Sequence, residues 1–162
     1  MSTPNASSYS LDVAFSSATN ALTAGRPILA MGYGFAELVP GDPWKGTGQG
    51  AEKVERQSDV YFSVYDTAPK PEKVTLITLH FPGPSPFSNA EGVGVSIPVA
   101  PKGSQPGQSV GCNVVGLAWI IGPYTVSDAI QDGTIYDVTV SVTLEDGRVF
   151  KVDPEIIVEG GG

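Results

Sequence analysis

The 162-residue chain contains a single cysteine and a single histidine. Cys112 has no partner for an intramolecular disulfide, and one cysteine with one distant histidine cannot supply the paired soft ligands of a zinc site. A catalytic triad needs a histidine as its base, and His80 lies in no Gly-x-Ser-x-Gly or comparable signature. The sequence therefore predicts a protein that is not an enzyme and has no cofactor and no zinc site.

Charged residues are also scarce, at 16% of the chain, and their formal balance is -8. The nine lysines and arginines stand singly, so no basic stripe is available for nucleic acid or anionic lipid. No stretch approaches the roughly 18 apolar residues of a membrane-spanning helix, and residues 1–7 lack the basic and apolar parts of an export signal. We expect a cytoplasmic protein that binds neither nucleic acid nor membrane.

Acidic residues gather near the C-terminus, but their spacing does not follow the EF-hand calcium loop. They are Asp128, Asp132, Asp137, Glu145, Asp146 and Asp153. Glycoside hydrolysis would need two such carboxylates about 5 to 9 Å apart across a cleft, which the spacing does not indicate. We predict no metal site from this pattern, and calcium binding by the acidic loops stays open.

The clearest structural signal is the strict alternation of apolar and polar residues from Tyr136 to Leu144. A period of two over nine residues predicts a half-buried β-strand and cannot form an apolar stripe on a helix. Residues 145–147 then supply a turn that ends in glycine, and residues 148–152 return beside the first strand. This segment is predicted to be a β-hairpin.

Similar patterns predict strands along the whole chain, separated by turns rich in the 20 glycines and 14 prolines. The predicted strands cover residues 9–15, 27–39, 59–65, 74–81, 93–99, 114–121 and 155–159, with a short edge strand at 54–57, and a helical turn stays open only at 124–130. About eight strands in this arrangement predict an all-β fold, an antiparallel immunoglobulin-like β-sandwich with long Gly/Pro-rich loops. We expect one domain over residues 8–159, between a disordered N-terminus at 1–7 and a flexible glycine tail at 160–162.

Residues 40–50 form the longest run of turn formers, so we predict a long surface loop there, and a second loop at 101–108. Trp44 is the first candidate for binding, together with Asp42 and Gln49 in the same loop. A large ring on a polar loop either packs back against the sandwich edge or is offered to a partner, and both readings stay open. Trp119, in the most apolar run of the chain, is predicted to be a core residue.

Asp132 stands four residues before Tyr136, which begins a predicted strand. This spacing resembles the tyrosine corner of immunoglobulin-like sandwiches. The resemblance implies that the Tyr136 hydroxyl pins a crossing loop while the ring joins the core.

Two further segments resemble a known family. The run Lys45-Gly-Thr-Gly-Gln-Gly-Ala, followed by Ser58-Asp59 and a strand, is similar to a Gly-Gln-Gly segment and the strand after it in the AidA/PixA bacterial inclusion-body proteins. The closing run Val152-Asp-Pro-Glu-Ile-Ile-Val resembles the Asp-Pro-x-Ile-x-Val ending of that family, although Val152 stands where the family has an aromatic residue. The resemblance implies a small, cytoplasmic, non-enzymatic β-sandwich that accumulates or self-associates.

The missing catalytic set and the predicted edge strands together favour a non-catalytic role. We expect the protein to act by self-association, as a homo-oligomer, or by binding a protein partner, through edge strands such as residues 93–99. The alternative is a carbohydrate-binding, lectin-like module. In that case Trp44 would stack on a sugar ring, while the acidic loops would hold calcium or accept hydrogen bonds from hydroxyls.

Overall fold

The computed structural model describes residues 8–18, 28–29, 32–39, 42–50, 53–109 and 114–161, with side chains for 8–18, 53–107 and 116–161. Within these ranges the regular structure is entirely β and comprises fourteen strands in three sheets. The described residues contain no helix that is long and apolar enough to cross a membrane. The all-β prediction is confirmed.

The strands order into one large sheet and two smaller ones. Sheet A contains β4 (Asp42–Gly50), β3 (Gly32–Val39), β1 (Ser8–Phe15), β6 (Asp59–Asp66), β10 (Val114–Thr125) and β9 (Gln105–Ser109), in this order. Sheet B contains β2 (Ile28–Leu29), β13 (Val149–Val152), β12 (Thr139–Leu144), β7 (Val74–His80) and β8 (Ser96–Val99). Sheet C contains β11 (Thr134–Asp137), β14 (Glu155–Gly161) and β5 (Lys53–Arg56).

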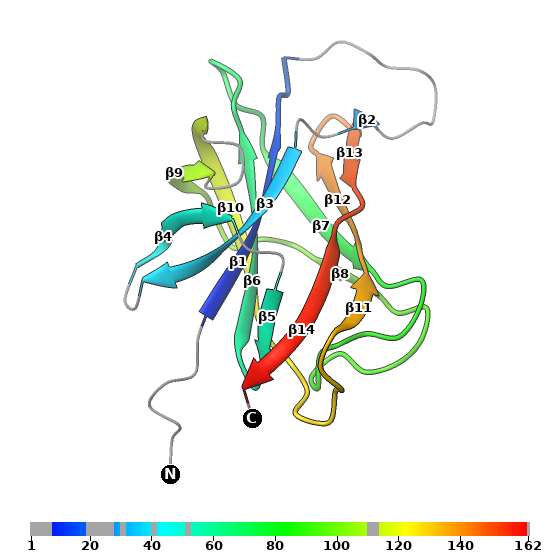
Figure 1. Ribbon diagram of the computed structural model, residues 1–162. Coiled ribbons are helices and arrows are strands. Elements are labelled where there is room, and N and C mark those ends of the chain that lie inside the picture. The colour runs from blue at the N-terminus through cyan, green and yellow to red at the C-terminus, as the bar shows by residue number, and fades with distance from the viewer. Residues whose placement is uncertain are drawn as a thin grey trace.

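Sheet A forms one layer and sheets B and C form the other, which gives a sandwich-like arrangement (Figure 1). The core between the layers is built from every second residue along the strands, the residues whose side chains point inward. β1 contributes Leu11, Val13 and Phe15, β6 contributes Val60, Phe62 and Val64, β7 contributes Ile77 and Leu79, and β12 contributes Val140, Val142 and Leu144. All of these side chains are buried.

The alternation predicted from Tyr136 to Leu144 is confirmed by the burial of Val138 and of every second residue after it. The segment is nevertheless divided at Val138, because its first part pairs with β14 in sheet C and its second part pairs with β13 and β7 in sheet B. The amide of Val138 donates to the carbonyl oxygen of Pro154 at 3.1 Å, level with the break between β13 and β14. The predicted hairpin is therefore the β12–β13 pair, and both of its strands change sheet at the same level.

The prediction of an antiparallel sandwich is wrong for three strand pairs. β1 runs parallel to β6, β2 runs parallel to β13, and β5 runs parallel to β14. In each pair the two strands are separated by other strands in the sequence, so they need not run in opposite directions as the strands of a hairpin must. The alternation of side chains is the same in parallel and antiparallel strands and could not reveal the direction.

The predicted loops at 40–50 and 101–108 are also partly wrong. β4 covers Asp42–Gly50 and pairs with β3, with two shifts of register, and β9 covers Gln105–Ser109. Both are edge strands of sheet A. An edge strand needs hydrogen bonds on one side only, so it tolerates prolines and glycines that a central strand would not. At the other end of the chain, β14 continues through Gly160 and Gly161, which were predicted to be a tail.

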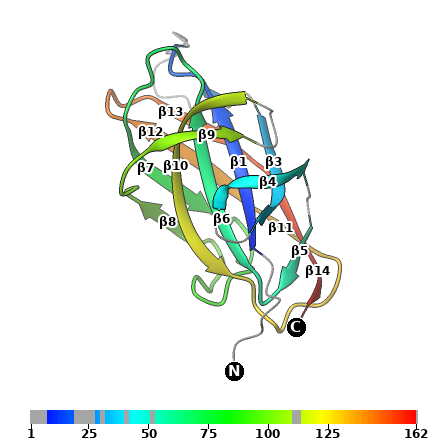
Figure 2. The same cartoon turned by 90° about the vertical axis from the view of Figure 1, so that its left-hand side faces the viewer.

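The centre of sheet A is buried on both of its faces. The inward face of β1 and β6 is apolar, and on the opposite face Ser10, Asp12, Ser63 and Tyr65 are also buried. The two edge strands, β4 and β9, contact each other, and β9 also contacts β1 and β6. The sheet therefore curls over its own outer face, and Figure 2 shows β4 and β9 crossing in front of β1 and β6.

The long connection from β7 to β8 is anchored in the core by two aromatic rings. Phe81 and Phe87 are both fully buried, and their ring centroids lie 5.6 Å apart in an edge-to-face arrangement. Phe87 also contacts Phe62 and Tyr124 of sheet A, with centroid distances of 6.1 and 5.4 Å. Such pairs add stabilisation beyond the buried area, so this connection is held against one end of the sandwich.

Gly116 marks the closest approach of β10 to β6. A Cβ atom built at Gly116 would collide with the carbonyl oxygen of Asp66 and would lie 2.9 Å from its carbonyl carbon. The obstacle is backbone, which cannot rotate away as a side chain could. Only glycine fits at this position of the β6–β10 pair.

We expect Gly116→Ala to lower the free energy of unfolding by about 1–3 kcal/mol, because the added methyl group must push β10 away from β6. Urea denaturation followed by circular dichroism measures this change. Gly83→Ala is the matched control, because nothing lies within 4 Å of a Cβ atom at Gly83. Equal stability of the two variants would contradict the close approach.

Candidate functional site

The predicted binding residues Asp42, Trp44 and Gln49 all belong to β4, at the edge of sheet A. Their side chains lie outside the described residues. The structure thus places these residues on a strand rather than on a free loop, and the two readings of the Trp44 ring are not decided.

Asp132 and Tyr136 lie near each other in sequence but serve different contacts. The Asp132 carboxylate forms an ion pair with Arg56 and accepts a hydrogen bond from the amide of Gly160 at 3.0 Å. The hydrogen bond from Gly160, followed by the contact with Arg56, holds the pKa of Asp132 below its ordinary value. Arg56 also donates to the carbonyl oxygens of Ile130 and Gly161. Asp132 thus ties the loop before β11 to β5 and β14, while the Tyr136 ring packs against the core.

Trp119 is a core residue, as predicted, with 3% of its surface exposed. That exposed part lines a groove of about 420 Å³ between β10 of sheet A and the start of β7 in sheet B. Pro71, Val74, Pro101 and Leu117 line the groove beside Trp119. A groove of this size falls in the range of small-molecule sites, about 300–1,000 Å³.

The rim of the groove carries charged side chains from two different loops. Glu72 and Lys73 precede β7, and Lys102 lies between β8 and β9. Sequence reasoning missed this site, because Lys73 and Lys102 look like ordinary surface residues of two turns. Only the packing of sheet A against sheet B brings them to one opening.

One wall of the groove is held by the buried carboxylate of Asp66. Its Oδ1 atom accepts hydrogen bonds from the amides of Ser17 and Ala68, both at 3.0 Å, and Oδ2 accepts from the amide of Glu72 at 2.9 Å. Three backbone donors converge on one carboxylate, which satisfies donors that the turn would otherwise leave unpaired. The segment from Asp66 to Glu72 is therefore fixed before any ligand arrives.

A second polar cluster lies under the curled edge of sheet A. The Ser10 hydroxyl donates to Oδ1 of Asp12 at 2.6 Å, and the Ser63 hydroxyl lies 3.0 Å from that of Ser10. The pKa of Tyr65 is raised well above its ordinary value, mainly because the phenol is buried and to a smaller extent because of the negative charge of Asp12. Nothing in the sequence distinguished these residues from the solvent-facing positions of an alternating strand.

His80 faces a hydroxyl group, which is an arrangement that an enzyme could use. Nδ1 of His80 lies 2.6 Å from Oγ of Ser96 on the neighbouring strand, and Thr139 on the other side of His80 donates to Asp153 at 2.6 Å. A triad would instead have a carboxylate on the second histidine nitrogen. Among the described residues, His80 with Ser96 and Thr139 with Asp153 form two separate pairs, both at exposed positions of sheet B.

The acidic residues near the C-terminus are engaged in local contacts. Asp146 accepts hydrogen bonds from the amide and the side chain of Arg148, and Asp153 accepts from Thr139. Oδ2 of Asp128 accepts a hydrogen bond from the side-chain nitrogen Nε2 of Gln57 at 3.4 Å. Among the residues that the structure describes, no three His, Cys, Asp or Glu side chains come together as metal ligands would.

Asp137 and Glu155 differ from the other acidic residues, because they stand directly opposite each other on β11 and β14. Both are exposed, and neither forms an ion pair with a described residue. Like charges at directly opposed positions of a sheet destabilise it. Next to them Ile135 is 55% exposed. The predicted alternation began at Tyr136, and only its extension by one residue would have placed Ile135 on the solvent face with Asp137.

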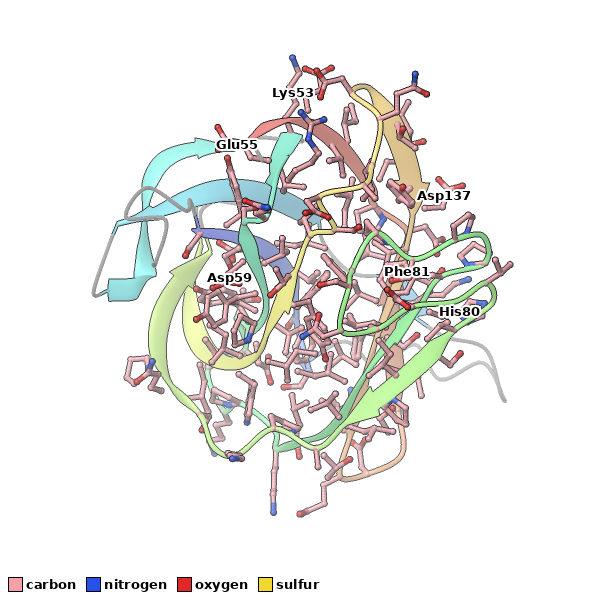
Figure 3. The ribbon with its side chains drawn as sticks, turned by 90° about the horizontal axis from the view of Figure 1, so that it is seen from below. Lys53, Glu55, Asp59, His80, Phe81 and Asp137 are labelled. Atoms are coloured by element: carbon pink, nitrogen blue, oxygen red, sulfur yellow. The ribbon has the colours of Figure 1, made fainter. Side chains whose placement is uncertain are left out.

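These residues occupy one outer face, which we call the sheet C face: Lys53, Glu55, Ile135, Asp137, Glu155, Ile157 and Glu159. Figure 3 shows Lys53 and Asp137 at opposite edges of sheet C, with β14 between them, and His80 on a different part of the rim. Lys53 pairs with Glu159 at 3.2 Å. Carboxylates outnumber the single lysine, so the sheet C face is acidic around an apolar centre.

The edge of β11 differs from the other edge strands with described side chains. The backbone amide of Phe81 donates a hydrogen bond to the carbonyl oxygen of Val95, which extends the β7–β8 ladder by one pair. Hydrogen-bonded and non-hydrogen-bonded pairs alternate in an antiparallel ladder, so the backbone of Pro98, which has no N–H, faces the free edge of β8. β9 carries Pro106, and β5 begins with Lys53. β11 has neither proline nor lysine. The hydrogen bond from the amide of Val138 to the carbonyl oxygen of Pro154 extends the ladder between β11 and β14 by one pair. In this register the backbone N–H and C=O groups of Ile135 and Asp137 face away from β14, toward the open side of β11.

Comparison with known proteins finds no matching family model, no similar curated protein and no similar solved structure. Two features of the described structure offer a surface for binding, the groove beside Trp119 and the edge of β11.

We expect the buried Tyr65 to destabilise the protein at alkaline pH. Its pKa is raised in the folded state, so the unfolded chain loses the phenol proton first, near pH 10, and the free energy of unfolding falls as the pH rises above that value. Urea denaturation at several pH values from about 8 to 11.5 measures this slope. Tyr65→Phe should be less sensitive to pH in that window, and an unchanged slope would contradict the assignment.

We expect Asp66→Ala to lower the free energy of unfolding by about 2–5 kcal/mol, because three backbone donors lose one buried acceptor. Thermal and urea unfolding both measure the change. Asp153→Ala is the control, since that carboxylate is exposed and accepts from Thr139 alone in the described structure. Its removal should change stability by about 0.5 kcal/mol or less.

Proposed function

We propose that the protein is a non-catalytic binding protein whose β11 edge accepts a basic β-strand from a partner. The observation that carries the proposal is the pair Asp137 and Glu155, two exposed and unneutralised carboxylates beside an open strand edge. A partner strand would hydrogen-bond to the outward backbone groups of Ile135 and Asp137. Its lysines or arginines would relieve the repulsion between the two carboxylates.

The chemistry of the surface selects a basic partner over a second copy of the chain. A second copy would bring another acidic sheet C face to this edge, in a protein with a formal net charge of -8. Ile135 offers an apolar contact at the centre, so the complementary strand alternates basic and apolar residues. The resemblance to AidA/PixA proteins implies a non-enzymatic role, which agrees with this proposal, and self-association, in place of which we propose a basic partner.

We also propose that the strands of the sandwich have an immunoglobulin-like arrangement. Its support is the spacing of Asp132 and Tyr136, with Asp132 tying a crossing segment to the sheet and the Tyr136 ring against the core. In this arrangement β11 lies at the border of sheets B and C, where the chain passes from one sheet to the other.

A synthetic peptide that alternates lysine and valine tests the proposal. We expect it to bind and to shift the NMR amide signals of Ile135 and Asp137, because it adds hydrogen-bond partners to both. Ile135→Lys should weaken binding by about tenfold, since it removes the apolar contact and repels the peptide. Val93→Lys is the matched control, because Val93 is the other large exposed apolar residue of the described chain, at 75% exposure.

The same lysine-valine peptide with every backbone amide N-methylated keeps the charge and has no backbone N–H donor. Equal binding of this peptide would show simple attraction between charges and would contradict strand addition. Concentration-dependent shifts of Ile135 without any peptide, with a doubled mass in light scattering, would assign the edge to a second copy and overturn the choice of a basic partner.

A further inference from the structure

The groove beside Trp119 is a second site, and it shares no residue with the sheet C face. Its apolar lining comes from Pro71, Pro101 and Leu117, together with the small exposed parts of Val74 and Trp119. Apolar and aromatic surface of this kind binds a flat or branched apolar group by removing both from water. A bound molecule therefore needs an apolar body.

The rim adds a charge requirement. Lys73 and Lys102 are exposed, and neither forms an ion pair with a described residue. By contrast, Lys53, Arg56 and Arg148 each form an ion pair with a carboxylate. Among the residues that line the groove, two lysines stand against the one carboxylate of Glu72. The Asp66 carboxylate behind the wall is buried and accepts hydrogen bonds from three backbone amides, so the lining itself carries an excess of positive charge in a chain that is acidic as a whole.

The walls are fixed by bonds that do not involve a ligand. The amide of Glu72 donates to the buried carboxylate of Asp66, and the carbonyl oxygen of Lys73 accepts from the amide of Glu145 at 3.0 Å. A preformed wall spares a ligand the cost of ordering the loop. The positions from which Glu72 and Lys73 reach the opening are thus set in the free protein.

We propose that this groove binds a small amphipathic organic anion, with its apolar body on Leu117, Pro71 and Pro101 and its carboxylate or sulfonate within reach of Lys73 and Lys102. A neutral sugar would gain no attraction between opposite charges from the two ammonium groups. A basic molecule would be repelled by them. Charge and shape together define the ligand class.

Two probes with matched aromatic rings test this assignment: 8-anilinonaphthalene-1-sulfonate, which is anionic, and N-phenyl-1-naphthylamine, which is uncharged. We expect the sulfonate to bind and to shift the NMR amide signals of Lys73, Lys102 and Leu117. The double variant Lys73→Gln with Lys102→Gln should weaken its binding by about tenfold, because two attractive charges are lost at the rim. Binding of the uncharged probe should be weaker than that of the sulfonate and unchanged by the double variant.

Lys151→Gln is the matched control, since Lys151 lies in β13, outside the groove, and also has no ion pair with a described residue. This variant should bind the sulfonate as the parent protein does, and the NMR spectrum of each variant verifies its fold. The inference is overturned if the sulfonate does not bind or shifts other residues. It is also overturned if the double variant binds the sulfonate as tightly as the parent. Because β11 is not involved, none of these outcomes bears on strand addition at that edge.

Discussion

The parallel pairing of β1 with β6 places two strands at the centre of sheet A, and both layers of the molecule form around them. Their inward side chains meet β7 and β12 in the core, and their outward side chains are covered by the curl of the same sheet. Strands covered on both faces usually carry apolar residues throughout. Here one face is polar, so Ser10, Asp12 and Ser63 must satisfy one another by hydrogen bonds.

The arrangement of the edges follows from this centre. Edge strands expose unpaired backbone groups, and a protein that stays free of non-specific aggregation must protect them. Proline serves this purpose in β8, and proline also interrupts β9. The exposed edge of β11 stands out because it lacks such protection and because Asp137 opposes Glu155 there. A stability cost retained at an open edge is the kind of local conflict that marks an interaction surface.

The predictions from sequence succeed where the signal is local. The alternation from Tyr136 to Leu144 predicted which side chains are buried, and Trp119 was placed in the core. They fail where an element depends on its neighbours. β4 forms despite its proline and three glycines, because β3 offers it a pairing edge. Tyr136 and Leu144 lie in different sheets because the strand is divided at Val138.

The sequence by itself determined the class of structure, since a period of two in apolar residues has one physical outcome, a strand with one face in the core. It also determined the acidic charge and the absence of a zinc or triad motif. The tertiary structure alone decided the direction of strand pairs, the burial of Asp12 and Tyr65, and the meeting of Lys73 with Lys102 at one groove. The reason is that burial and proximity depend on the distance between segments far apart in the chain, and a local pattern carries no information about that distance.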